Sequence, residues 1–476
     1  MSADTVVIGA GVNGLVAAHL LARGGRRVTV LEQRATANGA PFMGWVPPQV
    51  IRELGLDRAG LSVRHGEPWV SSALPDGTRL ELSSDIARSQ DAIKRLSAAD
   101  AAKWPEFAQR MRRLSGVLEA LYVQPPPDVE SRDPKELMHL AMVALKVRRL
   151  GKQAVVDLIR ILPMSSAELL DDWFESDALK GVLGAASVLH LHQGPKSGGT
   201  AFNLLHHHVG CPAGVFRQPS SNVRDVLERM PGVDVRRGAA VARLNVTGGR
   251  VTGVRLANGE EIAATTVVSS GDPRHTMLGL LEPGWLEPEY ARAVKNIKCR
   301  GVAATVTLDL KGAAPFDSLL IAPSLMHLER AYDDAKYGRA SKEPWLEANA
   351  EGNRILVHAQ YAPYGLRDGG WDDARRAAFG NAVVARLLSA APELKGAITV
   401  RDIVTPKDLE VTQGLTEGQA YHGELTLDQI LFMRPVPGWP YRTPIAGLFL
   451  CGAGTHPGGA IAGASGRNAA REILRS

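Results

Sequence analysis

The sequence contains little cysteine. Its 476 residues include three cysteines, Cys211, Cys299 and Cys451, which lie far apart along the chain. Because no C-x-x-C pair occurs, a thiol–disulfide relay of the thioredoxin reductase kind is excluded. Three scattered cysteines also argue against a secreted fold that depends on disulfides.

Long apolar runs are missing as well. No stretch of about twenty uninterrupted apolar residues occurs, so no transmembrane helix is expected. The chain enters a strand pattern directly, without the pattern of a secretory leader, which predicts a cytoplasmic protein. The formal net charge is +5, and the basic residues are scattered rather than gathered with aromatic ones. This distribution argues against a nucleic-acid partner. A chain of this length favours two or three domains.

The most informative stretch is at the start of the chain. The apolar run Val6-Val7-Ile8 leads into G-x-G-x-x-G, followed by a helical pattern over 15–23 and a second apolar run that ends at Glu32. This order of strand, glycine turn, helix, strand and acid is the dinucleotide-binding fingerprint in its full context. Gly9 permits the tight turn, Gly11 lets the backbone approach a pyrophosphate, and Gly14 lets helix and strand pack closely. Glu32 can then accept a hydrogen bond from a ribose hydroxyl.

The middle of the chain is predominantly helical. A hairpin is predicted over 69–82, and the pattern from 84 to 191 is helical, with a helix start at Ser97. The segment 137–162 combines apolar residues at helical spacing with several lysines and arginines. It is interpreted as a helical cap over a substrate cavity, with solvated charges. A peripheral contact with a membrane is the alternative.

Three consecutive histidines, His206 to His208, invite the hypothesis of a metal site. Consecutive residues on a helix point about 100° apart, so three in a row cannot converge on one ion. No metal is therefore predicted.

The second half returns to short strands. Three strands over 240–268, with turns at Gly248-Gly249 and Asn258-Gly259, predict a β-meander that runs into an apolar strand. Further strands at 302–310, 354–361 and 398–404 and a helix at 372–389 predict a second domain built on a sheet. Near the end, a strand at 446–450, a glycine-rich loop over 451–459 and a helix over 461–474 again offer backbone N–H groups to an anion or a ring edge.

Taken together, the fingerprint, the meander before Asp272-Pro273 and the stretch 447–467 (GLFLCGAGTHPGGAIAGASGR) resemble the phytoene desaturase-like FAD oxidoreductases of the amine oxidase flavoprotein superfamily. Within them, the stretch 414–438 is similar to the branch named for pyridine nucleotide-disulphide oxidoreductase domain 2. The resemblance implies an α/β fold: a Rossmann-like FAD-binding domain assembled from 1–68, 193–275 and 441–476, and a mixed-sheet substrate domain with a helical cap from 69–192 and 276–440.

The resemblance also implies non-covalently bound FAD and hydride removal from a small apolar, isoprenoid-like substrate to flavin N5. Gly452 and Ala453 would approach the diphosphate, Val241 the adenine, and the turn 460–463 the N1–C2=O edge of the flavin. The cofactor-binding residues implied are Gly9, Gly11, Val12, Asn13, Gly14, Glu32, Gln33, Val241, Gly452, Ala453, Gly459, Ala460, Ile461 and Ala462. Three side chains, His422, Arg434 and His456, are the candidates for catalysis around the ring, and His422 could shuttle a proton at neutral pH.

Two departures from the family pattern keep alternatives open. Asn38-Gly39 stands where the family has a glycine pair, and Gln218 to Asn222 replaces a second pair. One alternative is therefore a non-redox protein, either a flavin-retaining isomerase or a degenerate binding or assembly module. The other is an NAD-dependent dehydrogenase that uses only the N-terminal unit. Substrate identity, electron acceptor and oligomeric state are left open by the sequence.

Overall fold

The computed structural model describes residues 4–36, 42–126 and 152–475, together with five isolated positions between 134 and 145. The substituted pair Asn38-Gly39 and eleven of the 26 residues of the segment 137–162, including the basic Lys146, Arg148 and Arg149, lie outside these residues. The alternative of a peripheral membrane contact is therefore still only an expectation. Among the described residues, no helix is long and apolar enough to cross a membrane.

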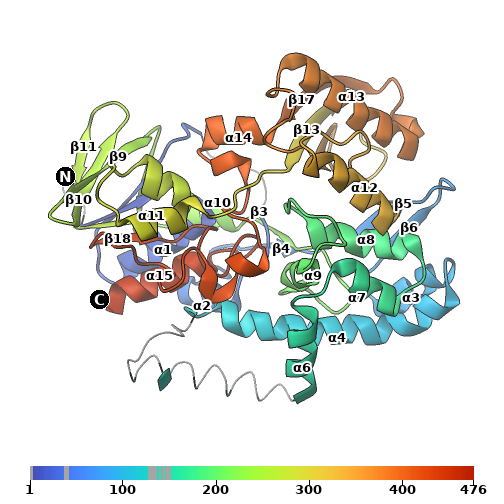
Figure 1. Cartoon of the computed structure of the whole chain (residues 1–476), viewed down its shortest axis with the longest axis horizontal. Coiled ribbons are helices and arrows are strands. Elements are labelled where there is room, and N and C mark those ends of the chain that lie inside the picture. Colours follow the sequence, from blue (N-terminus) through green and yellow to red (C-terminus); the bar gives the residue numbers. More distant parts are fainter. Residues whose placement is uncertain are drawn as a thin grey trace.

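A parallel five-stranded sheet forms one lobe of the molecule (Figure 1). Its order is β18-β12-β1-β2-β8, and every neighbouring pair is parallel. The strands are β1 (Thr5–Ile8), β2 (Val28–Glu32), β8 (Asp234–Arg237), β12 (Thr266–Ser269) and β18 (Leu448–Leu450). They come from three distant parts of the chain, which confirms a Rossmann-like sheet built from discontinuous segments.

Both faces of this sheet are covered, which explains why its strands are continuously apolar. Val7 and Val30 pack on one face, against α1 (Val12–Arg23), α2 (Pro48–Leu54), α10 (Val223–Arg229) and α15 (Ala464–Arg475). Val6 and Leu31 pack on the other face, against the predicted meander. The meander is confirmed as β9 (Val241–Thr247), β10 (Arg250–Leu256) and β11 (Glu261–Ala263), with α11 (Pro288–Lys295) beside it. The predicted last meander strand is split, because its second half is β12 of the parallel sheet.

A mixed seven-stranded sheet forms the second lobe, in the order β17-β13-β16-β15-β14-β5-β6. Only β14 and β5 pair in parallel. The strands are β5 (Val70–Ala73), β6 (Arg79–Leu82), β13 (Ala303–Leu310), β14 (Ser318–Ile321), β15 (Leu346–Glu351), β16 (Arg354–Gln360) and β17 (Ile398–Val404). The helix α13 (Asp373–Ala390) packs on one face through Phe379, Val383 and Leu387. The predicted hairpin and the predicted mixed sheet of a second domain are therefore confirmed, and its role in holding substrate stays a prediction.

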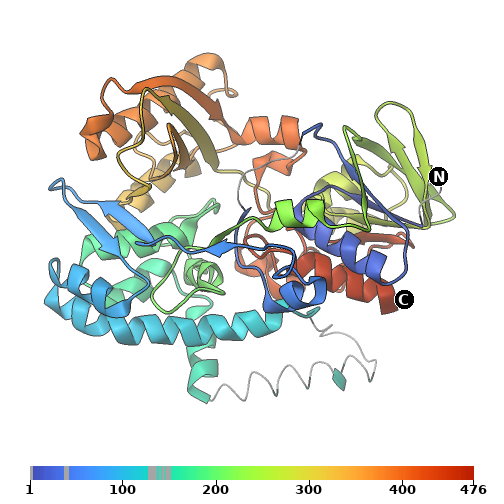
Figure 2. The ribbon, with the colours of Figure 1, turned by 180° about the vertical axis from the view of Figure 1, so that it is seen from behind.

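A helical layer lies on the other side of this sheet (Figures 1 and 2). It contains α3 (Ile86–Lys94), α4 (Ala98–Tyr122), α6 (Lys152–Ile161), α7 (Ser166–Trp173), α8 (Asp177–Val188), α9 (Thr200–His208) and α12 (Leu325–Lys336). As predicted, Ser97 caps α4 by accepting a hydrogen bond from the backbone N–H of Asp100 at 3.0 Å. The helix α9 packs with α4 and α8, so this part of the predicted segment 193–275 belongs to the helical layer. The other predicted domain boundaries stay predictions.

Short elements join the lobes. They are β3 (Phe42–Met43), β4 (Val63–Arg64), β7 (Ser220–Ser221) and α14 (Pro406–Gln413). The stretch that replaces the second glycine pair contains β7, which pairs with both β3 and β4. The C-terminal helix begins at Ala464 rather than at the predicted residue 461, because Gly463 has a φ of +75° and ends a separate turn.

Candidate active site

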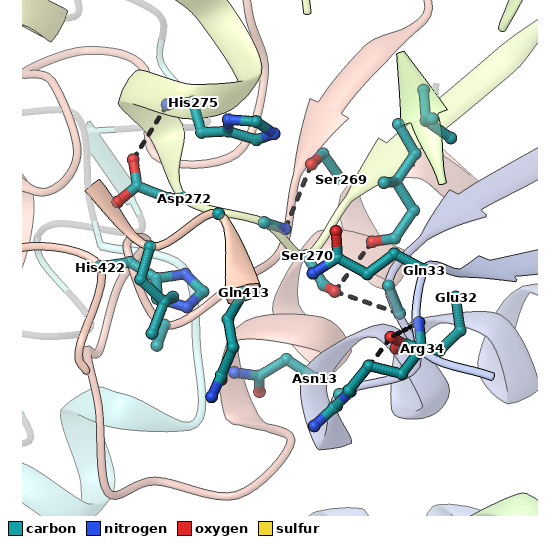
Figure 3. Close-up of a pocket in the computed structure, with 18 of the residues that line it drawn as sticks. Asn13, Glu32, Gln33, Arg34, Ser269, Ser270, Asp272, His275, Gln413 and His422 are labelled. Carbon is teal, nitrogen blue, oxygen red and sulfur yellow. Dashed lines mark hydrogen bonds and ion pairs between the residues drawn. The ribbon is translucent and has the colours of Figure 1, made fainter. Parts of the chain in front are cut away.

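A cavity of about 340 Å³ opens at the carboxyl ends of β1, β2 and β12, beside the first turn of α1. In a parallel sheet this edge is where ligands bind. Figure 3 shows side chains from the sheet, from α1 and from the segments around Asp272, Gln413 and His422 arranged around it. We call it the sheet-end cavity.

The first turn of α1 presents free backbone to this cavity. Gly11 is the residue before the helix, and no side chain caps the helix there. A Cβ built on Gly11 would meet no atom within 4 Å, so the backbone lies open. The side-chain oxygen Asn13 Oδ1 is buried without a hydrogen-bond partner. A helix N-terminus with unpaired N–H groups favours an anion such as a diphosphate.

Glu32 is fixed as a charged acceptor at the end of β2. Its Oε2 accepts from the backbone N–H of Ala10 at 2.9 Å, and its Oε1 accepts from the backbone N–H of Arg34 at 3.0 Å. Burial opposes the charge, but these hydrogen bonds and the Arg34 guanidinium hold the pKa of Glu32 below its usual range. The carboxylate can therefore accept hydrogen bonds from a sugar at neutral pH (Figure 3).

Arg224, on α10, is a lining residue that the sequence analysis missed. Its Nε is buried without a hydrogen-bond partner. Burial lowers the pKa of this guanidinium, and the charge of Arg34 lowers it further. The carboxylates of Glu228, Glu32 and Asp225 oppose this shift, but Glu32 is paired with Arg34 and Glu228 with Arg237. A diphosphate bound in the cavity would give Arg224 a direct anionic partner. Nothing in the sequence distinguishes Arg224 from other surface arginines, because only the fold carries α10 to the cavity.

His422 lies at the far end of the sheet-end cavity, near Asp272 and His275 (Figure 3). Its backbone has a φ of +56°, and its Nδ1 is buried without a partner. Burial and the Arg434 charge lower the pKa of His422, although Asp272 opposes the shift. The imidazole is therefore neutral at pH 7. Two further orphaned polar atoms, on Asn13 and Arg224, belong to residues that line the same cavity, and a polar dinucleotide fits them.

A second cavity, of about 280 Å³, lies between the mixed sheet and helices α8 and α9. Its walls are mostly apolar and include Val182, Leu189, Phe216, Leu320 and Trp345. We call it the inner cavity.

The two cavities meet at two chain segments. Phe42 lines the sheet-end cavity and Met43 the inner one. Likewise, Ala420 and His422 line the first and Tyr421 the second. Adjacent residues of the chain thus line different cavities. A cofactor ring bound at this end of the sheet-end cavity would therefore border the inner cavity.

The structure brings together most of the implied cofactor residues. Gly9, Gly11, Val12, Asn13, Glu32, Gln33, Val241 and Ala453 line the sheet-end cavity, and Ala460 lines the inner one. Gly14 lines neither cavity, and a Cβ there would lie 2.2 Å from the carbonyl oxygen of Gly9, which agrees with its predicted packing role.

The remaining glycine-loop residues, Gly452, Gly459, Ile461 and Ala462, also line neither cavity. Ala462 N–H donates to the carbonyl oxygen of Trp45 at 2.7 Å, and Trp45 N–H donates to that of Ala460 at 3.0 Å. The turn 460–463 is thereby fixed to Trp45, and its approach to the flavin stays a prediction.

Arg434 does not face either cavity. It is buried, and its guanidinium donates only to backbone carbonyls at 2.7–3.2 Å. The acceptors are the carbonyl oxygens of Tyr421, Gly423, Glu424, Gln429 and Ala453. No donor is left for a substrate, which corrects the prediction that Arg434 is catalytic.

His456 is also placed away from both cavities. Its Nε2 donates to the carbonyl oxygen of Leu121 at 3.3 Å, and its ring meets Tyr122 edge-on at 5.8 Å. Burial lowers the pKa of His456 to about 4. These contacts give His456 a role in packing, while its Nδ1 is buried without a hydrogen-bond partner, so the catalytic role stays a prediction.

The three consecutive histidines diverge, as predicted. His206 accepts from the Tyr122 hydroxyl at Nδ1 and donates from Nε2 to the carbonyl of Gly459, each at 2.8 Å. His208 stacks on Phe216 with ring centroids 4.5 Å apart. His207 instead lines the inner cavity, as does His190, to which the sequence analysis gave no role. Within 4–36, 42–126 and 152–475, no three potential ligands gather into a metal site.

Comparison with known proteins identifies the family. The sequence profile described as flavin containing amine oxidoreductase matches residues 48–474. The chain belongs to this family. A second profile, described as an NAD(P)-binding Rossmann-like domain, matches residues 7–41, which include the fingerprint.

Relatives over the full length support the assignment. The chain is 30% identical to pyridine nucleotide-disulfide oxidoreductase domain-containing protein 2 of Rattus norvegicus, over 99% of this chain and 93% of the relative. It is 25% identical to hydroxyneurosporene desaturase of Rubrivivax gelatinosus, over 98% and 93% of the two chains. The fold is similar to that of putrescine oxidase with bound putrescine, with a TM-score of 0.59, 15% identity and full coverage of both chains.

The cofactor is therefore FAD, and the chain is an FAD-dependent oxidoreductase of the amine oxidase family. The family assignment favours this conclusion over both the nicotinamide dehydrogenase and the non-redox alternative.

Proposed function

We propose that this chain oxidises an apolar, isoprenoid-like substrate held in the inner cavity, with hydride passing from a substrate carbon to N5 of FAD. The observation that carries the proposal is the apolar inner cavity bordering the sheet-end cavity at Phe42-Met43 and at 420–422. Bound FAD supplies the electron-accepting chemistry. The chain must place the substrate carbon against the ring and keep water out.

The walls of the inner cavity are suited to that task. Trp345, Phe216 and Leu189 present large apolar surfaces, and Trp345 is almost completely buried. An apolar lining removes water from both the substrate and the ring edge, which protects the reduced cofactor from side reactions.

His422 is the residue proposed to accept the proton that the substrate loses when hydride passes to the flavin. It lies where the two cavities meet, and its unpartnered Nδ1 is neutral at pH 7 and free to accept. We expect His422→Asn to slow flavin reduction while FAD content stays at the wild-type level. Stopped-flow reduction kinetics equal to those of the wild type would contradict this role.

The overall proposal is tested on the purified holoenzyme without oxygen. Isoprenoid compounds of ten and fifteen carbons are mixed with it, and the visible flavin absorption is followed. Bleaching by an isoprenoid is the expected result. Putrescine and cyclohexylamine serve as matched amine probes, and bleaching by these amines alone would overturn the proposal.

A further inference from the structure

Four polar aromatic side chains lie close together in the wall of the inner cavity, whose other polar lining residues are Arg217, Gln218, Ser318, Glu347 and Asn349. His190, His207, His358 and Tyr421 all line it. The ring centroids of His190 and Tyr421 are 4.8 Å apart, those of His190 and His358 5.0 Å, and those of His207 and Tyr421 6.0 Å. Four groups able to form hydrogen bonds therefore share one small region beside the segment 420–422.

His207 has an unused hydrogen-bonding atom in this cluster. Its Nε2 is buried and has no partner. Burial, together with the neighbouring His206 and His190, lowers the pKa of His207 well below the usual value, so the ring is neutral. A buried polar atom without a partner is costly, and a ligand that bonds to it recovers that cost.

His190 is held in a strained backbone conformation that directs its ring into the cluster. Its φ is +57°, which is unusual for a residue other than glycine. Two buried glutamines hold it there. His190 N–H donates to Gln360 Oε1 at 3.3 Å, and the His190 carbonyl accepts from Gln419 Nε2 at 2.9 Å. Strain kept in place by dedicated partners is typical of functional positions.

The cluster also lacks a net charge. Burial and the neighbouring His358 lower the pKa of His190 to about 3, so this ring is neutral too. The one carboxylate that lines the inner cavity, Glu347, forms an ion pair with Arg217 at 2.7 Å. An ammonium group would lose its hydration here without gaining a free anion.

We infer that the substrate of the inner cavity carries a hydroxyl group, which His207 and its neighbours His190 and Tyr421 bind as a neutral hydrogen-bonding site. A hydroxyl both donates and accepts, so it satisfies His207 Nε2 in either tautomer. A pure hydrocarbon would leave that atom unpaired, and an amine would bring an unpaired charge. The inference rests on the proposed function, because it takes the inner cavity as the substrate site.

The test uses four probes that share one ten-carbon ring skeleton: p-menthane, menthol, menthone and menthylamine. Their binding to the holoenzyme is measured from the change in the visible flavin spectrum, which needs no turnover. We expect menthol to bind at least about tenfold more tightly than p-menthane, and menthylamine to bind most weakly.

Two variants test whether His207 is the residue that causes the preference for menthol over p-menthane. His207→Leu should abolish the preference for menthol over p-menthane, and His207→Gln should retain part of it, because an amide still forms hydrogen bonds. Thermal unfolding of both variants checks that they fold, and if neither does, the four-probe series on the wild-type protein decides alone.

Equal binding of menthol and p-menthane, an unchanged preference in folded His207→Leu, or tightest binding by the amine would overturn the inference. Selective menthol binding without flavin reduction by any isoprenoid would support the inference and count against the proposed hydride transfer instead. Failure of all four probes to bind would overturn the inference.

Discussion

The open backbone at Gly11 allows a sharp test of the FAD site. Gly11 has a φ of −70° and a ψ of 164°, which any L-residue adopts. A Cβ there meets no protein atom within 4 Å, yet Gly11 lines the sheet-end cavity. The Gly11→Ala methyl group should therefore leave the apoprotein unchanged and obstruct only the approach of the diphosphate.

The expected loss follows from the hydrogen bonds that the methyl group displaces. One hydrogen bond to a charged acceptor contributes about 1.5–3 kcal/mol. At about 1.4 kcal/mol per factor of ten, Gly11→Ala should raise the FAD dissociation constant roughly 10- to 100-fold. Titration of apoprotein with FAD, followed by flavin fluorescence, measures this constant.

Two further glycine variants act as controls. A Cβ at Gly365 also meets nothing within 4 Å but lies outside the cavity, so Gly365→Ala should leave the FAD affinity unchanged. At Gly14 a Cβ would lie 2.2 Å from the Gly9 carbonyl oxygen, so Gly14→Ala should lower the melting temperature of the apoprotein itself. Wild-type FAD affinity in Gly11→Ala would refute the placement of the diphosphate.

Three other predictions follow from buried groups. Arg434→Met should destabilise the protein by about 4 kcal/mol or more, because it leaves buried carbonyls unpaired. A stable variant in thermal unfolding would show that the arginine is not structural. Arg224→Met should weaken FAD binding without lowering the stability of the apoprotein, and Arg224→Lys should weaken it less; titration with FAD decides. Burial lowers the pKa values of His206, His208 and His456 to about 4. Their unfolded forms take up protons below about pH 6.5. Stability should therefore be present above that pH and fall as the pH drops toward 4, and a flat melting temperature across this range would contradict the prediction.

The FAD-binding unit could be predicted from the sequence because its signals are local. Gly9, Gly11, Gly14 and Glu32 lie within one strand–helix–strand unit, and the meander has its own turn signals. The inner cavity could not be predicted, since His190, His207 and Tyr421 come from separate segments that only the packed helical layer brings to the mixed sheet. Arg434 was misjudged for a related reason. The carbonyls that converge on it come from residues 421 to 453. A sequence shows the type of each side chain but not where the backbone carbonyls point.

The position of Arg434 explains how the boundary between the two cavities is held. Its guanidinium has no contact with either cavity. It donates hydrogen bonds to the carbonyls of Tyr421 and Gly423, on either side of His422, and to that of Ala453, which lines the sheet-end cavity. These bonds fix the backbone in which His422 has its positive φ and in which Tyr421 faces the inner cavity while His422 faces the other. Burial lowers the pKa of Arg434 to about 10, so the charge that aligns these carbonyls persists at neutral pH. Arg434 lines neither cavity, yet it holds the backbone that places Tyr421 in the wall of one cavity and His422 in the wall of the other.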